Sequence, residues 1–117
     1  MTRIEKYLAW VHDGSSQSLK ESAEGHYPPA QYQLFMSSKN EEEFKNQLLE
    51  AAEQGYGPAC YRGALVSFKE RNYAKTGEYG AKMQRNWKPF DEHDAYQMDE
   101  VYYNMGRIYS NENEEPQ

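Results

Sequence analysis

The chain contains an internal repeat, and this feature limits the possible folds more than any other. When the sequence is displaced by 29 residues, residues 19–32 align with residues 48–61 without a gap, and 8 of the 14 positions are identical. The identical pairs are Leu19/Leu48, Glu21/Glu50, Ala23/Ala52, Glu24/Glu53, Tyr27/Tyr56, Pro29/Pro58, Ala30/Ala59 and Tyr32/Tyr61. Each copy contains the end of a predicted helix, a glycine turn and a helix start led by proline. One junction used twice predicts stacked helical hairpins, because each repeat buries its apolar face only against its neighbours.

Capping and turn residues divide the rest of the chain into further predicted helices. Thr2 and Glu5 form a capping box at the start of the first, and Gly14 marks its end. The others are expected at residues 16–24, from 28 to just before Ser37, at 41–54 behind an Asn40 cap, from 57 to about 71, at 73–83, and from Asp91 or Asp94 to Tyr109. No stretch alternates β-branched apolar and polar residues, so no strand is predicted. The expected fold is all-α: a short α-α superhelix of helical hairpins over residues 1–109, followed by a disordered acidic tail at 110–117.

Short motifs inside these segments resemble a known family. Ala-Ala-Glu-Gln-Gly at 51–55 and Pro-Ala-Cys-Tyr at 58–61 are similar to the helix-turn-helix junction of Sel-one-like repeats, which are relatives of the tetratricopeptide repeat. Residues 22–25 and 30–34 resemble the same junction, and residues 103–109 resemble the family's Tyr-Asn-Leu-Gly helix. This resemblance implies a helical-repeat protein that binds other proteins. Small acidic members resemble immunity proteins, which neutralise bacterial toxins.

The sequence departs from the family pattern in four places. The spacing of 29 residues is shorter than the ~34 of a tetratricopeptide unit. Gly63-Ala64 stands where Leu-Gly is expected, and residues 87–94 show no recognisable junction before the third copy. The paired cysteines of secreted members are absent, since Cys60 is the only cysteine.

Composition and charge exclude several classes of function. A chain of 117 residues predicts one domain, and a net charge of −6 opposes sequence-independent binding to nucleic acids or to anionic membranes. The charge fits a basic protein surface, although it can also serve only to keep a small domain soluble. No signal-peptide pattern and no apolar run of about 20 residues is visible, so the expected location is the cytoplasm.

No group of residues in the sequence has the spacing of a catalytic or metal site. Residues 91–94, Asp-Glu-His-Asp, suggest a metal or acid/base cluster, but successive helical residues diverge, and a capped helix start is the simpler interpretation. His12, His26 and Cys60 have no ligand spacing, and Cys60 lies in a segment predicted to be packed. The sequence therefore predicts a protein that is not an enzyme and uses no cofactor.

The function expected from the sequence is binding of one protein partner. The main hypothesis is a stoichiometric inhibitor or immunity protein that occludes a basic toxin or enzyme; the alternatives are an acidic mimic of nucleic acid or a general adaptor. Eleven tyrosines serve either core packing or a binding surface, since tyrosine is enriched in both places. By analogy with the concave face of related repeats, Arg62, Tyr102 and Arg107 are predicted to contact the partner. Asp94 and Tyr96, near the start of the last predicted helix, and Trp87, in a predicted loop without an evident core role, complete the predicted partner-binding set.

Overall fold

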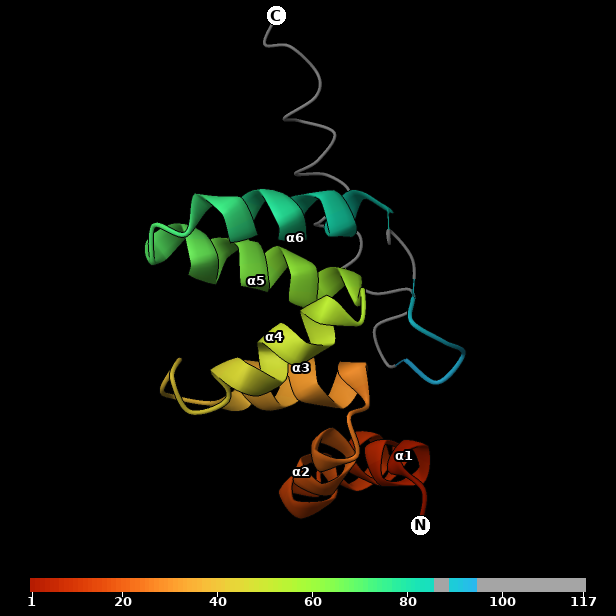
Figure 1. The fold of residues 1–117 in the computed structure, drawn as a ribbon. Helices are drawn as coiled ribbons and strands as arrows, with labels where there is room; N and C mark the ends of the chain where they lie inside the picture. The colour runs from red at the N-terminus through yellow and green to blue at the C-terminus, as the bar shows by residue number, and fades with distance from the viewer. Residues whose placement is uncertain (86–88, 95–117) are drawn as a thin grey trace, which may run out of the picture.

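Within residues 1–85, six α-helices follow one another and pack as sequential hairpins (Figure 1). The computed structural model describes residues 1–85 and 89–94. Its helices are α1 (Arg3–Asp13), α2 (Ser16–Glu24), α3 (Pro28–Ser37), α4 (Lys45–Glu53), α5 (Gly57–Lys69) and α6 (Tyr73–Arg85). The described residues contain no strand, which confirms the all-α prediction for that part of the chain.

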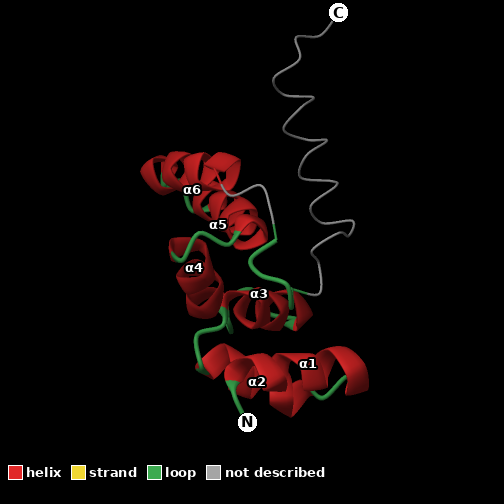
Figure 2. Ribbon diagram, turned by 90° about the vertical axis from the view of Figure 1, so that its right-hand side faces the viewer, coloured by secondary structure: helices red, strands yellow, loops and turns green. Residues whose placement is uncertain are grey.

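The hairpins are arranged in layers that follow the order of the sequence. Helices α1 and α2 lie at one end, α3 and α4 lie in the middle, and α5 and α6 lie side by side at the other end (Figures 1 and 2). The repeated junction therefore links α2 to α3 and α4 to α5, at the two places where the chain passes from one layer to the next. Within the described ranges, no helix combines the length and the apolar character needed to cross a membrane.

The predicted helix ends at the N-terminal side are confirmed. Thr2 and Glu5 form the capping box at the start of α1, and Gly14 ends that helix with a left-handed φ of 69°. Only glycine takes this conformation without steric cost, so the turn requires it. Proline opens both α3 and α5, where its missing amide hydrogen would have had no partner within the helix.

The fourth helix starts later than the sequence predicts. Asn40 does not cap it; residues 41–44 form a turn, and α4 begins at Lys45. The side chain of Asn40 accepts a hydrogen bond from the Glu42 amide at 3.0 Å, and the Ser38 hydroxyl accepts one from the Asn40 amide at 3.1 Å. These local bonds satisfy the backbone without a helix, so they compete with the helical conformation.

Of the two starts predicted for the last helix, the structure contradicts the one at Asp91; the other, at Asp94, adjoins residues outside the described ranges. Residues 91–93 form a bend and turn, so no helix begins at Asp91. The remainder of the predicted helix to Tyr109 and the predicted tail at 110–117 lie outside the described residues.

Positions shared by the two repeat copies form the centre of the core. Leu19, Ala23, Tyr27 and Ala30 belong to one buried cluster, and their counterparts 29 residues later belong to a second. All eight side chains are at most 3% exposed. The small alanines allow the helix backbones to approach closely, while the tyrosine rings fill the larger spaces. The repeat is therefore a pattern of core packing.

We expect Ala59→Leu to lower the free energy of unfolding by about 1–3 kcal/mol, because Ala59 is fully buried in the cluster that contains Ala52. Ala74→Leu is the matched control, since Ala74 is exposed on α6. Chemical denaturation of the two variants measures the difference. If both unfold at the wild-type denaturant concentration, the close contact at this junction is not present.

Candidate functional site

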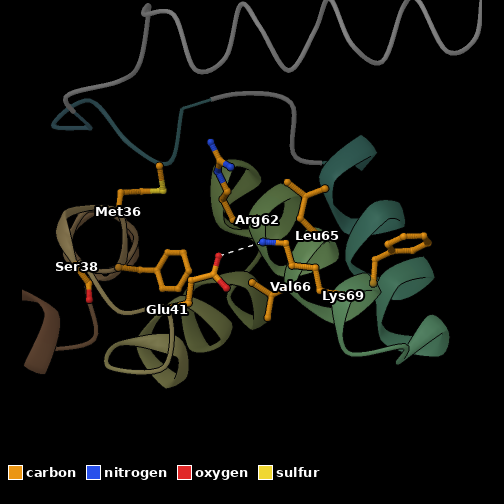
Figure 3. Close-up of a pocket in the computed structure, with 9 residues that line it drawn as sticks. Met36, Ser38, Glu41, Arg62, Leu65, Val66 and Lys69 are labelled. Atoms are coloured by element: carbon orange, nitrogen blue, oxygen red, sulfur yellow. Dashed lines mark hydrogen bonds and ion pairs between the residues drawn. The ribbon is translucent and has the colours of Figure 1, made fainter.

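A groove lies between the end of α3 and the face of α5 (Figure 3). Its volume is about 350 Å³. It is lined by Phe35, Met36, Ser38, Glu41, Arg62, Leu65, Val66, Phe68 and Lys69. Residues 62, 65, 66 and 69 share one face of α5, because residues three and four apart in a helix lie above one another. The spacing of these residues in α5 therefore places a continuous strip of side chains along the groove.

The groove exposes large apolar side chains to solvent. Met36 is 41% exposed, Leu65 39% and Phe68 59%. Phe35 and Val66, which also line the groove, are buried in the core cluster. The apolar surface continues to Tyr73 on α6, whose ring packs edge-on against Phe68 with centroids 5.7 Å apart. Contiguous exposed apolar surface of this kind commonly marks an interaction site.

Arg62, which the sequence predicts to bind a partner, lines this groove. Its guanidinium lies 5.6 Å from the centre of the Tyr61 ring, a distance suited to a cation–π contact. The Nε atom is buried and has no hydrogen-bond partner among the described residues. The residue as a whole is only partly buried, so its charge can act on a ligand in the groove although the Nε atom itself is enclosed.

The turn before α4 is held against the groove by ion pairs. Glu41 in the turn and Lys69 on α5 are 3.2 Å apart, and Figure 3 shows this pair across the groove. Lys45 pairs with Glu70 just beyond, and the hydrogen bond from Lys45 to Glu70 raises the pKa of the lysine. Both contacts are near the surface and contribute little to stability, but they fix where the turn lies.

A second assembly joins residues 89–94 to both copies of the repeated junction. We call Tyr27, Tyr56, Phe90, Asp91 and Asp94 the tyrosine clasp. The Tyr27 hydroxyl lies 2.8 Å from each carboxylate oxygen of Asp91, and the Tyr56 hydroxyl donates to Asp94 at 3.1 Å. The Phe90 ring meets both tyrosine rings edge-on, with centroids 5.8 and 6.2 Å away. The repeat therefore supplies two equivalent hydroxyls to two aspartates three residues apart.

The clasp changes the interpretation of Asp94. The sequence predicts that Asp94 contacts a partner, but its side chain is fully buried and also accepts a hydrogen bond from the Phe90 amide at 3.1 Å. The structure therefore places this carboxylate inside the protein, because Tyr56 provides a buried donor for it. The other predicted contacts, Trp87, Tyr96, Tyr102 and Arg107, lie outside the described residues.

Burial raises the pKa of Tyr27, the other tyrosine of the clasp. The larger cause is the loss of hydrating water around the hydroxyl, and the hydrogen bond to Asp91 adds to it. The phenol therefore remains protonated and continues to donate at any physiological pH.

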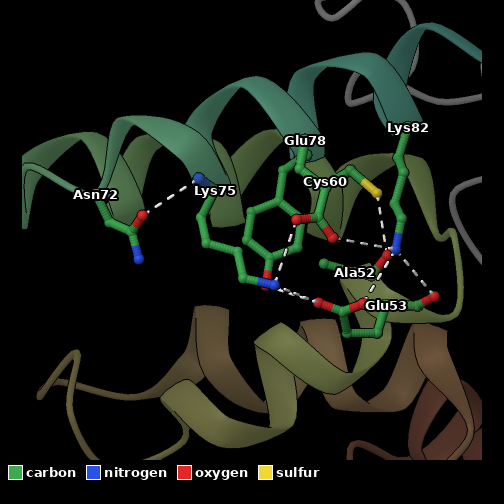
Figure 4. A network of polar contacts seen from close by, with 8 residues as sticks. Ala52, Glu53, Cys60, Asn72, Lys75, Glu78 and Lys82 are labelled. Carbon is green, nitrogen blue, oxygen red and sulfur yellow. Dashed lines mark hydrogen bonds and ion pairs between the residues drawn. The ribbon is translucent and has the colours of Figure 1, made fainter.

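A polar network connects the end of α4 to α6 (Figure 4). The Glu53 carboxylate lies 3.0 Å from Lys82 and 3.5 Å from Lys75, and it accepts a hydrogen bond from Tyr79 at 3.1 Å. The hydrogen bond from Lys82 lowers the pKa of Glu53. All of these groups already have partners, so the network serves to orient the helices.

Beneath this network lies Cys60, whose thiol is 3.3 Å from the Ala52 carbonyl oxygen. Burial raises the pKa of Cys60 to about 11, so the reactive thiolate is scarce at pH 8. We expect native protein at pH 8 to react with a disulfide reagent such as DTNB at less than about 1% of the rate of unfolded protein. Absorbance at 412 nm measures the reaction, with the denatured protein as the control. A fast stoichiometric reaction of the native protein would show that Cys60 is accessible.

Apart from Arg62, neither the groove nor the clasp is indicated by a local pattern in the sequence. Arg62 was predicted from its position, but the apolar residues around it have no motif and become a surface only when α3 and α5 are brought together. The link between the tyrosines and the aspartates carries no local signal either. Within residues 1–85 and 89–94, no three His, Cys, Asp or Glu side chains are grouped so that they could hold a metal ion.

No protein-family model matches the chain, and comparisons with curated proteins and with solved structures give no significant match.

Proposed function

We propose that the chain is a protein-binding module whose binding surface is the groove between α3 and α5. The observation that carries the proposal is the open apolar lining, in which Leu65 and Phe68 remain exposed beside Arg62, a cation without an acidic partner among residues 1–85 and 89–94. Large apolar side chains left in solvent do not help the chain to fold. Their exposure is explained if a partner covers the groove.

The distribution of charge supports a partner with a basic surface. Residues 1–85 contain 11 basic and 11 acidic residues, whereas residues 86–117 contain 2 basic and 8 acidic residues. The whole net charge of −6 therefore comes from the last 32 residues. Such an acidic block accelerates association with a basic partner, while the groove supplies the apolar contact that slows dissociation.

More specifically, we propose that the chain is a stoichiometric inhibitor of the immunity type, which occludes a toxin or enzyme. It rests on the resemblance to Sel-one-like repeats and on the acidic C-terminal block. A mimic of nucleic acid would need carboxylates spread regularly over one face, and residues 1–85, which carry no net charge, do not favour that alternative.

Affinity capture with full-length baits tests the proposal. The baits are wild type, Leu65→Asp in the groove and Val11→Asp on α1, where valine is similarly exposed at 42%. We expect wild type and Val11→Asp to retain the same partner and Leu65→Asp to lose it, because a charge in the apolar centre of an interface costs more than about 2 kcal/mol. Circular dichroism of each bait verifies that it is folded.

Titration of the captured partner then tests inhibition. We expect its activity to fall to zero at one equivalent of wild-type protein. Equal capture by all three baits would contradict the groove as the binding surface, and a saturated complex with full activity would contradict inhibition.

A further inference from the structure

The groove contains one cation that the described part of the protein does not neutralise. Lys69 is paired with Glu41 at 3.2 Å. Arg62 forms no ion pair with any acidic side chain of residues 1–85 or 89–94, and its buried Nε lacks an acceptor there. Its ring contact with Tyr61 neutralises no charge. Arg62, which is only partly buried, therefore offers a positive charge to whatever enters the groove.

The position of Arg62 on α5 relates this charge to the apolar lining. Leu65 and Val66 follow it at three and four residues, so they lie one turn along the same face. Figure 3 shows Arg62 and Leu65 on the same side of the groove, with Met36 opposite on α3. If a ligand places an apolar side chain against Leu65, a polar group next to that side chain therefore lies within one helical turn of Arg62.

We propose that the groove binds a polypeptide segment of the partner in which an Asp or Glu carboxylate lies beside apolar side chains, with Arg62 binding that carboxylate. This inference rests on the proposed function and adds the chemistry of the ligand. A guanidinium matches a carboxylate through parallel hydrogen bonds, which makes the pair both strong and directional. A partner that is basic overall can still present one acidic side chain at this point.

The rest of the groove favours a single negative charge over a doubly charged phosphate. Glu41 and Lys69 in the same groove pair with each other, so the charge left for a ligand to match is the single positive charge of Arg62, which one carboxylate balances. The remaining lining is largely apolar, and it would not solvate the second charge of a phosphate.

Selection from a displayed library of random 15-residue peptides, with the full-length protein as target, tests the inference. We expect enriched peptides to combine apolar residues with one conserved Asp or Glu. Replacing that residue by Gln or Asn in a synthetic copy should weaken binding to wild type about tenfold or more, since a hydrogen bond to a charged group in a desolvated site is worth about 1.5–3 kcal/mol. The same replacement should change binding to Arg62→Met less than about twofold, because methionine keeps the apolar stem and removes the charge.

The outcomes separate this inference from the proposed function. The selection could enrich apolar peptides that have no acidic position and that do not bind Leu65→Asp. This result would contradict the proposed carboxylate ligand of Arg62, but the groove would remain a binding surface. Peptides that bind Leu65→Asp as well as they bind wild type, or a selection that enriches none, would overturn both. Enrichment of phosphorylated peptides over their Asp and Glu counterparts in a parallel phosphopeptide array would also overturn the carboxylate.

Discussion

Tyr56→Ala is expected to lower the free energy of unfolding by about 3–5 kcal/mol, the range for removing a large buried aromatic ring. Tyr56 is 1% exposed, and its ring packs edge-on against Tyr32 and Phe90. The substitution would leave a cavity at the repeated junction and remove the donor to Asp94. Urea denaturation followed by circular dichroism measures the loss.

Two further variants separate the ring from the hydroxyl. Tyr56→Phe keeps the packing and deprives the buried Asp94 carboxylate of one donor, so we expect a loss of about 1–3 kcal/mol. Tyr73→Ala is the control for an exposed tyrosine, because Tyr73 is 60% exposed. If Tyr56→Ala costs no more than Tyr73→Ala, the clasp does not form as described.

Leu48→Ala is expected to lower the free energy of unfolding by about 2–5 kcal/mol, whereas Leu65→Ala should lower it by less than about 1 kcal/mol. The two changes delete the same atoms, but Leu48 is fully buried on α4 and Leu65 is 39% exposed in the groove. Differential scanning calorimetry of both variants provides the comparison.

This pair of variants also tests the character of the groove. A small loss for Leu65→Ala would mean that leucine is not needed there for folding, as the proposed binding role requires. A loss equal to that of Leu48→Ala would mean that the groove is part of the core and would remove the argument for a partner.

The sequence predicts most of the helical framework because its signals are local. A capping box, a left-handed glycine or a leading proline acts within one helical turn, so Thr2, Gly14 and Pro28 mark helix ends correctly. The start of α4 was predicted wrongly for the same reason. Asn40 is a good cap by type, but the side chains of Ser38 and Asn40 accept hydrogen bonds from the amides of Asn40 and Glu42, and these bonds favour a turn instead.

The candidate site is less visible in the sequence because it depends on contacts between distant elements. Arg62 was predicted to contact a partner and lies in the groove, but the exposure of Met36 and Phe68 beside it follows from how α3 and α5 pack. Asp94 was predicted to lie on the surface, and the structure buries it. The burial depends on a hydrogen bond from the Tyr56 hydroxyl, 38 residues earlier, which the sequence around Asp94 does not indicate.

The tyrosine clasp also bears on the order in which the chain assembles during synthesis. Most packing joins consecutive helices, but the bond from Tyr27 to Asp91 spans 64 residues. Helices α1 to α4 have their neighbours as soon as they leave the ribosome, and contacts close in sequence form quickly. The contacts of Tyr27 with Asp91 and of Tyr56 with Asp94 can form only after residues 89–94 have been translated. Completion of the clasp is therefore a late step of assembly, which follows the pairing of consecutive helices.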